Sequence, residues 1–462
     1  MPAFAPPASD ATPIWLASAD TWDTVKASIG RPAAAFAERC GFKPKAGKLQ
    51  LVAGDGGTLA AVLFGVDKPG EPTHDPLATG RLATGLPEGV YRFANPPPDA
   101  ALAALGFLLG LYRYERFKAE PGPPQPQLVA PPGVDPAGIE RIAEAIAFGR
   151  DLVSAPANVL GPNALEREAV RLAERLGASL HIVRGDDLLA ANFPLIHAVG
   201  RAALELPRLV DFSWGRLDAP KVTLVGKGVT FDSGGLDIKT AAGMELMKKD
   251  MGGAATALTL ARAVMEAKLD LRLRVLIPIV ENAISAQSMR PGDVVKSRKG
   301  LQVEIGNTDA EGRLILADAL ALADEEAPEL IVDFATLTGA ARVALGPDLP
   351  PFYTDDEALA AAIMGHAAKA RDPVWRMPLW RPYDAMIDGT VGDVSNSGTG
   401  AGMAGSITAA LFLRRFVTKV KAWAHFDVYA WNPKPRAHGP VGGEIQAARA
   451  MFGLLSERCL AR

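Results

Sequence analysis

The sequence is poor in the residue types that build disulfide frameworks and zinc sites. Its 462 residues include two cysteines, Cys40 and Cys459, near opposite ends of the chain. Two cysteines so far apart provide neither a disulfide framework nor a cysteine-based zinc site, and they favour a reducing compartment. The six histidines show no metal-binding spacing such as HExxH, which argues against a zinc site built from histidine.

The chain also lacks a strong charge of one sign and a long apolar run. The chain has 49 basic and 52 acidic side chains, which give a net charge of -3. This balance provides no excess of positive charge for binding nucleic acid as the main partner. The longest apolar run, residues 100–112, is too short to span a bilayer and predicts a buried helix. The N-terminal residues lack the pattern of a secretory signal, so we expect a cytoplasmic protein without a membrane partner.

A proline-dense segment divides the sequence. Residues 119–136 read AEPGPPQPQLVAPPGVDP, which cannot continue a helix or a central strand. A chain of this length is expected to form two domains. We predict an N-terminal α/β domain over residues 1–120, a proline-rich linker over 121–137 and a large C-terminal domain over 138–462.

The larger domain alternates apolar strands with helices, which predicts an α/β fold. Its central sheet should be mostly parallel or mixed and flanked by helices, with the active site beyond the carboxyl ends of the strands. The predicted strands of this domain are 180–185, 209–214, 221–228, 271–282, 302–306 and 329–339, and its helices are 164–177, 243–268 and 311–326. In the N-terminal domain we predict strands 49–54 and 59–66 and a helix near 99–118.

Three segments of the larger domain carry polar residues where an apolar core pattern predicts none. They read VGKGVTFDSGGLDIK (225–239), MELMKKDMGGAA (244–255) and NTDAEGRL (307–314). Their glycines allow the backbone to approach a ligand closely. The polar residues of interest are Lys227, Asp232, Lys239, Asp250, Asp309, Glu311 and Arg313.

Taken singly, each of these residues has an ordinary interpretation. The lysines and Asp250 suit a solvated surface, and Thr308 with Glu311 forms a capping-box pattern. Together, however, three carboxylates from separate strand ends can converge on one point of an α/β sheet. Carboxylates brought that close repel one another, and bound divalent cations such as Mg, Mn or Zn relieve the repulsion.

The same segments resemble the leucyl aminopeptidase, or cytosol aminopeptidase, family. The match is close in GKGVTFDSGG (226–235), MKKDMGGAA (247–255), NTDAEGRL (307–314) and DFATLTGA (333–340). Weaker matches extend it across roughly residues 150–430, namely DLVSAPANVLGP (151–162), AVGRAA (198–203), MAGSITAALFLRRF (403–416) and WAHFD (423–427). The N-terminal domain is similar to that of the family only in position and size.

The resemblance implies a metalloaminopeptidase that releases N-terminal residues, leucine and other apolar ones, from peptides with a free N-terminus. It implies two divalent metal ions, Mn or Zn with Mg or Co as alternatives, and a homohexamer. Lys227, Asp232, Asp250 and Glu311 would hold one ion, and Asp232, Asp309 and Glu311 the other, so that Asp232 and Glu311 bridge the pair. Lys227 must bind as a neutral amine, because an ammonium group has no lone pair.

Further roles follow from the same resemblance. Lys239 would stabilise the developing oxyanion, and Arg313 would hold a bicarbonate ion that acts as general base. Residues expected to contact substrate are Lys239, Met247, Asn307, Thr336, Leu337 and Gly339.

Two segments depart from the family pattern. The family has a small Ala-Gly-like pair after WAHFD, where this chain has Val428, Tyr429 and Ala430, so the side-chain preference of the pocket is open. The C-terminal glycine-rich segment is also altered, reading HGPVGGEIQAAR (438–449). Three other functions remain open, a DNA-binding regulator, a phosphoesterase with a similar di-metal site, and an inactive relative with a structural role.

Overall fold

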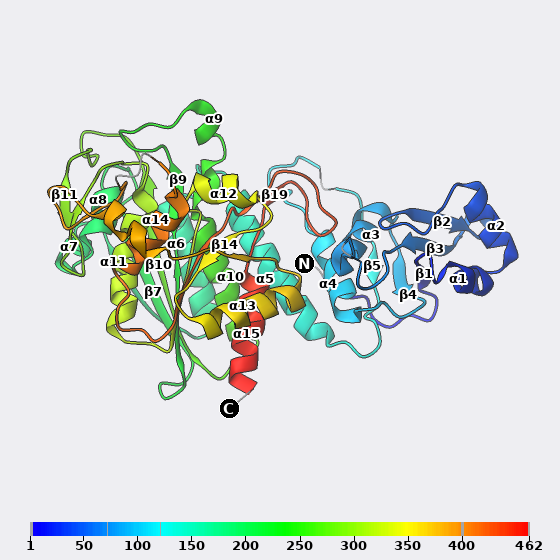
Figure 1. The fold of residues 1–462 in the computed structure, drawn as a ribbon. Coiled ribbons are helices and arrows are strands. Elements are labelled where there is room, and N and C mark those ends of the chain that lie inside the picture. Colours follow the sequence, from blue (N-terminus) through cyan, green and yellow to red (C-terminus); the bar gives the residue numbers. More distant parts are fainter. Residues whose placement is uncertain (1–2, 72, 121, 399–401, 461–462) are drawn as a thin grey trace. The chain divides into compact units, whose positions relative to one another are not determined.

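The computed structural model describes residues 3–71, 73–120, 122–398 and 402–460. Contacts between residues of the chain group it into two compact units (Figure 1). Unit 1 comprises residues 1–147 and 432–441, and unit 2 comprises residues 148–431 and 442–462. Among the described residues, no helix is long and apolar enough to cross a membrane.

Unit 1 is built on a five-stranded sheet in the order β2-β3-β1-β4-β5, in which only β2 and β3 pair in the antiparallel direction. The segment predicted as a linker contributes the short strand β5 to this sheet. The strands are β1 (Thr12–Ala17), β2 (Leu49–Ala53), β3 (Leu59–Gly65), β4 (Val90–Phe93) and β5 (Gln127–Leu128). The helices are α1 (Trp22–Ile29), α2 (Arg31–Arg39), η1 (Asp55–Gly57), η2 (Pro76–Thr79), α3 (Gly80–Gly85) and α4 (Ala100–Gly110), and α5 (Pro136–Ser154) runs past the boundary of the unit.

The apolar run at residues 100–112 forms α4, and this prediction of a buried helix is confirmed. Its glycines serve close packing. A Cβ atom at Gly110 would lie 2.3 Å from the Gly80 carbonyl oxygen, and one at Gly106 would lie 2.7 Å from the Leu77 carbonyl oxygen. The glycines therefore let α4 pack directly on η2 and α3.

Unit 2 is built on a nine-stranded mixed sheet in the order β15-β14-β17-β13-β8-β10-β7-β6, with β9 paired to β10. The pairs from β17 through β10 are parallel, and antiparallel pairs join β10 to β7, β7 to β6 and β14 to β17. The strands are β6 (Ser179–Arg184), β7 (Arg208–Trp214), β8 (Lys221–Gly226), β9 (Gly228–Asp232), β10 (Arg272–Asn282), β13 (Leu330–Ala335), β14 (Pro351–Tyr353), β15 (Trp375–Arg376) and β17 (Trp423–Asp427). Smaller pairings involve β11 (Val294–Lys296), β12 (Gln302–Glu304), β16 (Val394–Ser395), β18 (Trp431–Asn432) and β19 (Gly442–Gly443).

Helices cover both faces of the nine-stranded sheet. Both α10 and α11 pack across β8, β10 and β13. Val225 of β8 joins the apolar cluster around α11, whereas a Cβ atom at the next residue, Gly226, would meet Ala254 of α10. Because successive strand residues point to opposite faces, the two helices lie on opposite sides. The helices are α6 (Pro162–Arg175), α7 (Asp187–Ala190), α8 (Pro194–Gly200), α9 (Ala241–Met244), η3 (Met247–Met251), α10 (Gly252–Glu266), α11 (Glu311–Glu325), α12 (Gly339–Leu345), α13 (Glu357–Ala370), η4 (Arg381–Ile387), α14 (Gly405–Arg414) and α15 (Ala448–Leu460).

The α/β class with two such parts is confirmed. The helix predicted near 99–118 ends at Gly110, and two other predicted elements are also wrong in detail. The single helix predicted over 243–268 is three shorter ones, α9, η3 and α10. Gly253 lets the first turn of α10 lie close to β13, because a Cβ atom at this position would lie 2.1 Å from the Phe334 carbonyl oxygen. The strand predicted over 221–228 breaks at Lys227, between β8 and β9.

Candidate metal and catalytic site

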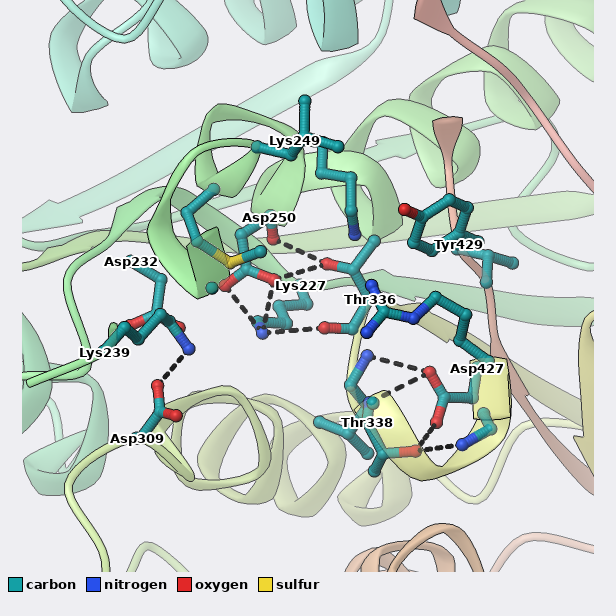
Figure 2. A pocket seen from close by; sticks show the side chains of 18 of the residues that line it. Lys227, Asp232, Lys239, Lys249, Asp250, Asp309, Thr336, Thr338, Asp427 and Tyr429 are labelled. Atoms are coloured by element: carbon teal, nitrogen blue, oxygen red, sulfur yellow. Dashed lines mark hydrogen bonds and ion pairs between the residues drawn. The ribbon is translucent and has the colours of Figure 1, made fainter. Parts of the chain in front are cut away.

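The five predicted metal ligands come together at the carboxyl ends of the central strands. Figure 2 labels Lys227, Asp232, Asp250 and Asp309. Lys227 lies at the break between β8 and β9, and Asp232 ends β9. Asp250 belongs to η3, and Glu311 is the first residue of α11, two residues after Asp309. Segments more than 80 residues apart in sequence therefore supply one cluster, as the position of the site in open α/β sheets predicts.

Lys227 occupies the centre of one half of the cluster. Its Nζ lies 2.8 Å from Asp250 Oδ2 and 2.9 Å from Glu311 Oε1, and it donates a hydrogen bond to the Thr336 carbonyl oxygen at 3.0 Å. Burial acts to lower the pKa of Lys227, but the charges of Asp250 and Glu311 outweigh it and raise this pKa above its ordinary value. The surrounding carboxylates thus favour the charged form of this lysine.

Lys239 lies between the carboxylates of the other half of the cluster. Its Nζ lies 2.7 Å from Asp232 Oδ2 and forms a second ion pair with Asp309 (Figure 2). Burial acts against the charged form, and the carboxylates nevertheless raise the pKa of Lys239. The side chain is largely buried, so this cation faces the cluster and not bulk solvent.

The carboxylates are close enough to compete for the same counter-charge. One oxygen each from Asp232, Asp309 and Glu311 lie within 4.8 Å of one another. Burial and the charge of Asp232 raise the pKa of Asp309 to about 6, and the same two causes raise the pKa of Glu311 well above its ordinary value. Groups whose ionised forms are penalised in this way gain from a bound cation.

The donor set fits divalent metal ions. Glu311 exposes 1% of its surface, its Oε1 is paired with Lys227, and its Oε2 accepts a hydrogen bond from no described residue. Buried carboxylate oxygens without donors are rare in folded proteins and point to a ligand. Four carboxylates and one amine are suitable donors for Mn or Zn. To bind a metal, Lys227 would have to give up its proton, and a neighbouring dication favours that loss.

A network that the sequence did not reveal holds Asp232 in place. Asn282, at the end of β10, donates from Nδ2 to Asp232 Oδ1 at 2.8 Å and to the Thr308 carbonyl oxygen at 3.1 Å. The backbone N–H of Gly234 donates to the same Asp232 oxygen at 2.9 Å. Gly234 has a φ of +89°, a conformation that favours glycine and turns the chain back toward the cluster.

A cavity of about 420 Å³ adjoins the cluster. Of the predicted substrate contacts, all except Asn307 line it, namely Lys239, Met247, Thr336, Leu337 and Gly339. Asn307 instead accepts a hydrogen bond from the Asp309 backbone N–H at 2.8 Å, which helps to position a predicted ligand.

Arg313 does not line this cavity. It is buried near Asn396, whose carbonyl oxygen accepts a hydrogen bond from Nη1 at 2.5 Å. Its Nε has no hydrogen-bond partner among the described residues, and burial lowers its pKa to about 10. The guanidinium group therefore retains a donor that could bind an anion.

Asp427 is a further site residue that the sequence analysis did not single out. It ends β17 and accepts hydrogen bonds from the Leu337 N–H at 2.9 Å, the Thr338 N–H at 3.2 Å and the Thr338 hydroxyl at 2.6 Å (Figure 2). This loop also presents the Thr336 carbonyl oxygen to Lys227. Asp427 therefore positions one wall of the cavity, and its place at a strand end was the available signal.

Known proteins are similar to this chain over most of its length. Residues 147–451 match the model described as "Cytosol aminopeptidase family, catalytic domain", and residues 12–131 match "M17 aminopeptidase, N-terminal domain". A protein named "Probable cytosol aminopeptidase" from Synechococcus sp. is 38% identical over 390 residues, which cover 81% of this chain and 80% of the relative. A similarly named protein from Geobacter sulfurreducens is 38% identical over 420 residues, covering 85% of this chain and 84% of the relative.

Two solved structures are similar along nearly the whole chain. The cytosol aminopeptidase from Coxiella burnetii has a TM-score of 0.93 and 42% identity, and the alignment covers 98% of each chain. The bottromycin maturation enzyme BotP in complex with Mn has a TM-score of 0.88 and 32% identity, with 97% of this chain and 99% of that chain covered.

Proposed function

Because this chain belongs to the cytosol aminopeptidase family, and is thus a metal-dependent aminopeptidase, we propose that it hydrolyses peptides at the Lys227 cluster through two divalent metal ions. The observation that carries the proposal is the convergence of four buried or half-buried carboxylates on two lysines. Isolated surface charges would not account for pKa values shifted in this way.

We assign the ligands of the two metal positions from the resemblance to the family. The first would be held by Lys227, Asp250, Asp232 and Glu311, and the second by Asp309 with Asp232 and Glu311 as bridges. The three oxygens within 4.8 Å of one another support the second position. The complex of BotP with Mn supports Mn as one candidate, with Zn as the other and Mg or Co as alternatives. When bound, such ions polarise a peptide carbonyl and lower the pKa of water.

The other side chains of the site would act on the substrate directly. Lys239 lies beside Asp309 and can donate to the oxygen of the scissile carbonyl as negative charge develops on it. The unpaired Nε of Arg313 supports the binding of a small anion such as bicarbonate, which would accept a proton as general base. The free amino terminus would lie toward Asp250, a buried carboxylate that lines the cavity.

The resemblance to the family also suggests an oligomeric state, a location and a substrate class. We propose a homohexamer located in the cytoplasm, with peptides as substrates and without a nucleic-acid or membrane partner. Met247 and Leu337, which line the cavity, support the release of leucine and other apolar first residues.

The test compares a peptide with a free N-terminus and the same peptide N-acetylated. We expect amino-acid release from the free peptide alone, loss of release with a chelator, and recovery when Mn or Zn is restored. Metal analysis of the purified protein should give two ions per chain, and an Asp232→Ala, Glu311→Ala double variant should lose them. Stoichiometric binding that survives in this variant, or release from the acetylated peptide, would contradict the proposal.

A further inference from the structure

One wall of the cavity carries two cations that face the same aromatic ring. Lys249 Nζ lies 4.6 Å from the centre of the Tyr429 ring, and Arg342 Cζ lies 5.6 Å from it. Lys249 comes from η3 and Arg342 from α12, and all three residues line the cavity. In Figure 2 the Lys249 amine points into the space between Thr336 and Tyr429.

Neither cation forms an ion pair with a carboxylate among the described residues, although the charges of Asp250 and Asp427 act on Lys249. Lys249 exposes 6% of its surface and forms no ion pair or hydrogen bond with any of them. The two nearest carboxylates already have donors, since Asp250 is bound by Lys227 and the Thr336 hydroxyl, and Asp427 accepts from Leu337 and Thr338. Burying an ammonium group without an anion is costly, and a ring face offsets only part of that cost.

Under the proposed function, a bound peptide would turn its scissile carbonyl oxygen toward Lys239 and its amino terminus toward Asp250. Lys239 and Asp250 line the same cavity as Lys249, Arg342 and Tyr429. The side chain of the first substrate residue, which branches from the carbon next to the amino group, would therefore extend into the space beside Lys249.

We propose that this pocket takes an acidic first residue in addition to apolar ones, with the side-chain carboxylate of glutamate between Lys249 and Arg342. The methylene groups of such a side chain would lie against Met247 and the Tyr429 ring. The inference rests on the proposed aminopeptidase function and names a substrate class for it.

The experiment measures kcat/KM of the metal-loaded full-length enzyme on Glu-, Gln- and Leu-aminomethylcoumarin amides. Glutamine has the shape of glutamate without its charge, so the ratio of the two rates isolates the charge. We expect a Glu/Gln ratio of about 10 or more, since a hydrogen bond to a charged group is worth about one such factor. The Lys249→Met variant keeps the length of the side chain and should bring the ratio to about 1.

Arg342→Glu is the second variant, because this side chain is exposed and its exchange should not disturb folding. It should lower the Glu/Gln ratio below that of the wild type and raise the rate on a Lys-aminomethylcoumarin amide relative to Gln. Lys369→Met removes an exposed cation of α13 outside the cavity and serves as the control, with an unchanged ratio.

The possible results separate the two proposals. A wild-type ratio at or below 1, with Leu and Gln amides hydrolysed, overturns the acidic pocket and leaves the aminopeptidase function intact. A high ratio that both variants retain overturns the assignment to Lys249 and Arg342. Absence of hydrolysis of every amide in the presence of Mn and Zn overturns both proposals.

Discussion

Replacement of Gly312 by alanine tests whether Lys227 belongs to the metal site. Gly312 is the second residue of α11, directly after Glu311. A Cβ atom there would lie 2.5 Å from Lys227 Cε and 2.7 Å from its Nζ. Non-bonded carbon atoms pack at about 3.5–4.0 Å, so the lysine side chain must move by about 1 Å. Lys227 cannot do so freely, because it is buried and held by Asp250, Glu311 and Thr336.

Two opposing magnitudes decide the outcome of Gly312→Ala. Alanine is the better helix former by up to about 1 kcal/mol, which favours a folded α11. A metal ligand, however, tolerates a displacement of only about 0.2 Å, so a shift several times larger should weaken metal binding on the order of 10- to 100-fold. We therefore expect a folded protein with an unchanged or slightly altered melting temperature and with low metal content.

The assay is titration of metal-free protein with Mn or Zn, followed by calorimetry of unfolding. Gly365→Ala is the matched control, because Gly365 lies inside α13 and a Cβ atom there meets nothing within 4 Å. That variant should gain about 0.5–1 kcal/mol of stability and keep its metal affinity. Wild-type metal affinity and activity in Gly312→Ala would refute the reasoning about Lys227.

Two further predictions concern residues that support the site and the fold. Asp427→Ala should cost about 2 kcal/mol of stability and lower kcat, since the Leu337–Thr338 loop loses its acceptor; unchanged kcat and melting temperature would contradict this. Glu166→Gln should lower the melting temperature at pH 7 by the loss of about 2 kcal/mol, because Arg208 is buried and loses its carboxylate. Burial acts to raise the pKa of Glu166, but Arg184 and Arg208 outweigh burial and lower this pKa. The contribution of the Glu166 carboxylate to stability is therefore present above pH 4.5 and is lost as pH falls through the lowered pKa. The difference between wild type and Glu166→Gln in calorimetry should therefore shrink below pH 4.5, and a constant difference would contradict the assignment.

Hydrophobic patterning predicted the fold class because strands buried on both faces read as continuous apolar runs. The strands at 272–282 and 330–335 were found within a few residues of their bounds for this reason. The break at Lys227 and the division of 243–268 into three helices were missed. Both depend on close contact between segments distant in sequence, as at Gly253 against Phe334, and such contact leaves no local pattern.

The predicted ligands were found in the sequence because they stand out as charged residues in apolar surroundings. Asn282 and Asp427 did not stand out, since one polar residue at a strand end has many ordinary explanations. Lys249 was hidden for another reason, as it is the second of two adjacent lysines in a short helix. Only the structure separates them, because Lys249 is buried at the cavity while Lys248 donates to the Ser154 carbonyl oxygen.

The residues proposed for catalysis and those proposed for substrate selectivity lie on different kinds of structural element. Lys227 and Asp232 sit directly on the sheet, and their neighbours are fixed by buried hydrogen bonds such as those of Asn282. Arg342 and Tyr429 lie on a short helix and a loop at the rim, where substitutions disturb less packing. Under the proposed function, exchange of Arg342 or Tyr429 should therefore change which first residue is accepted without moving the proposed metal ligands.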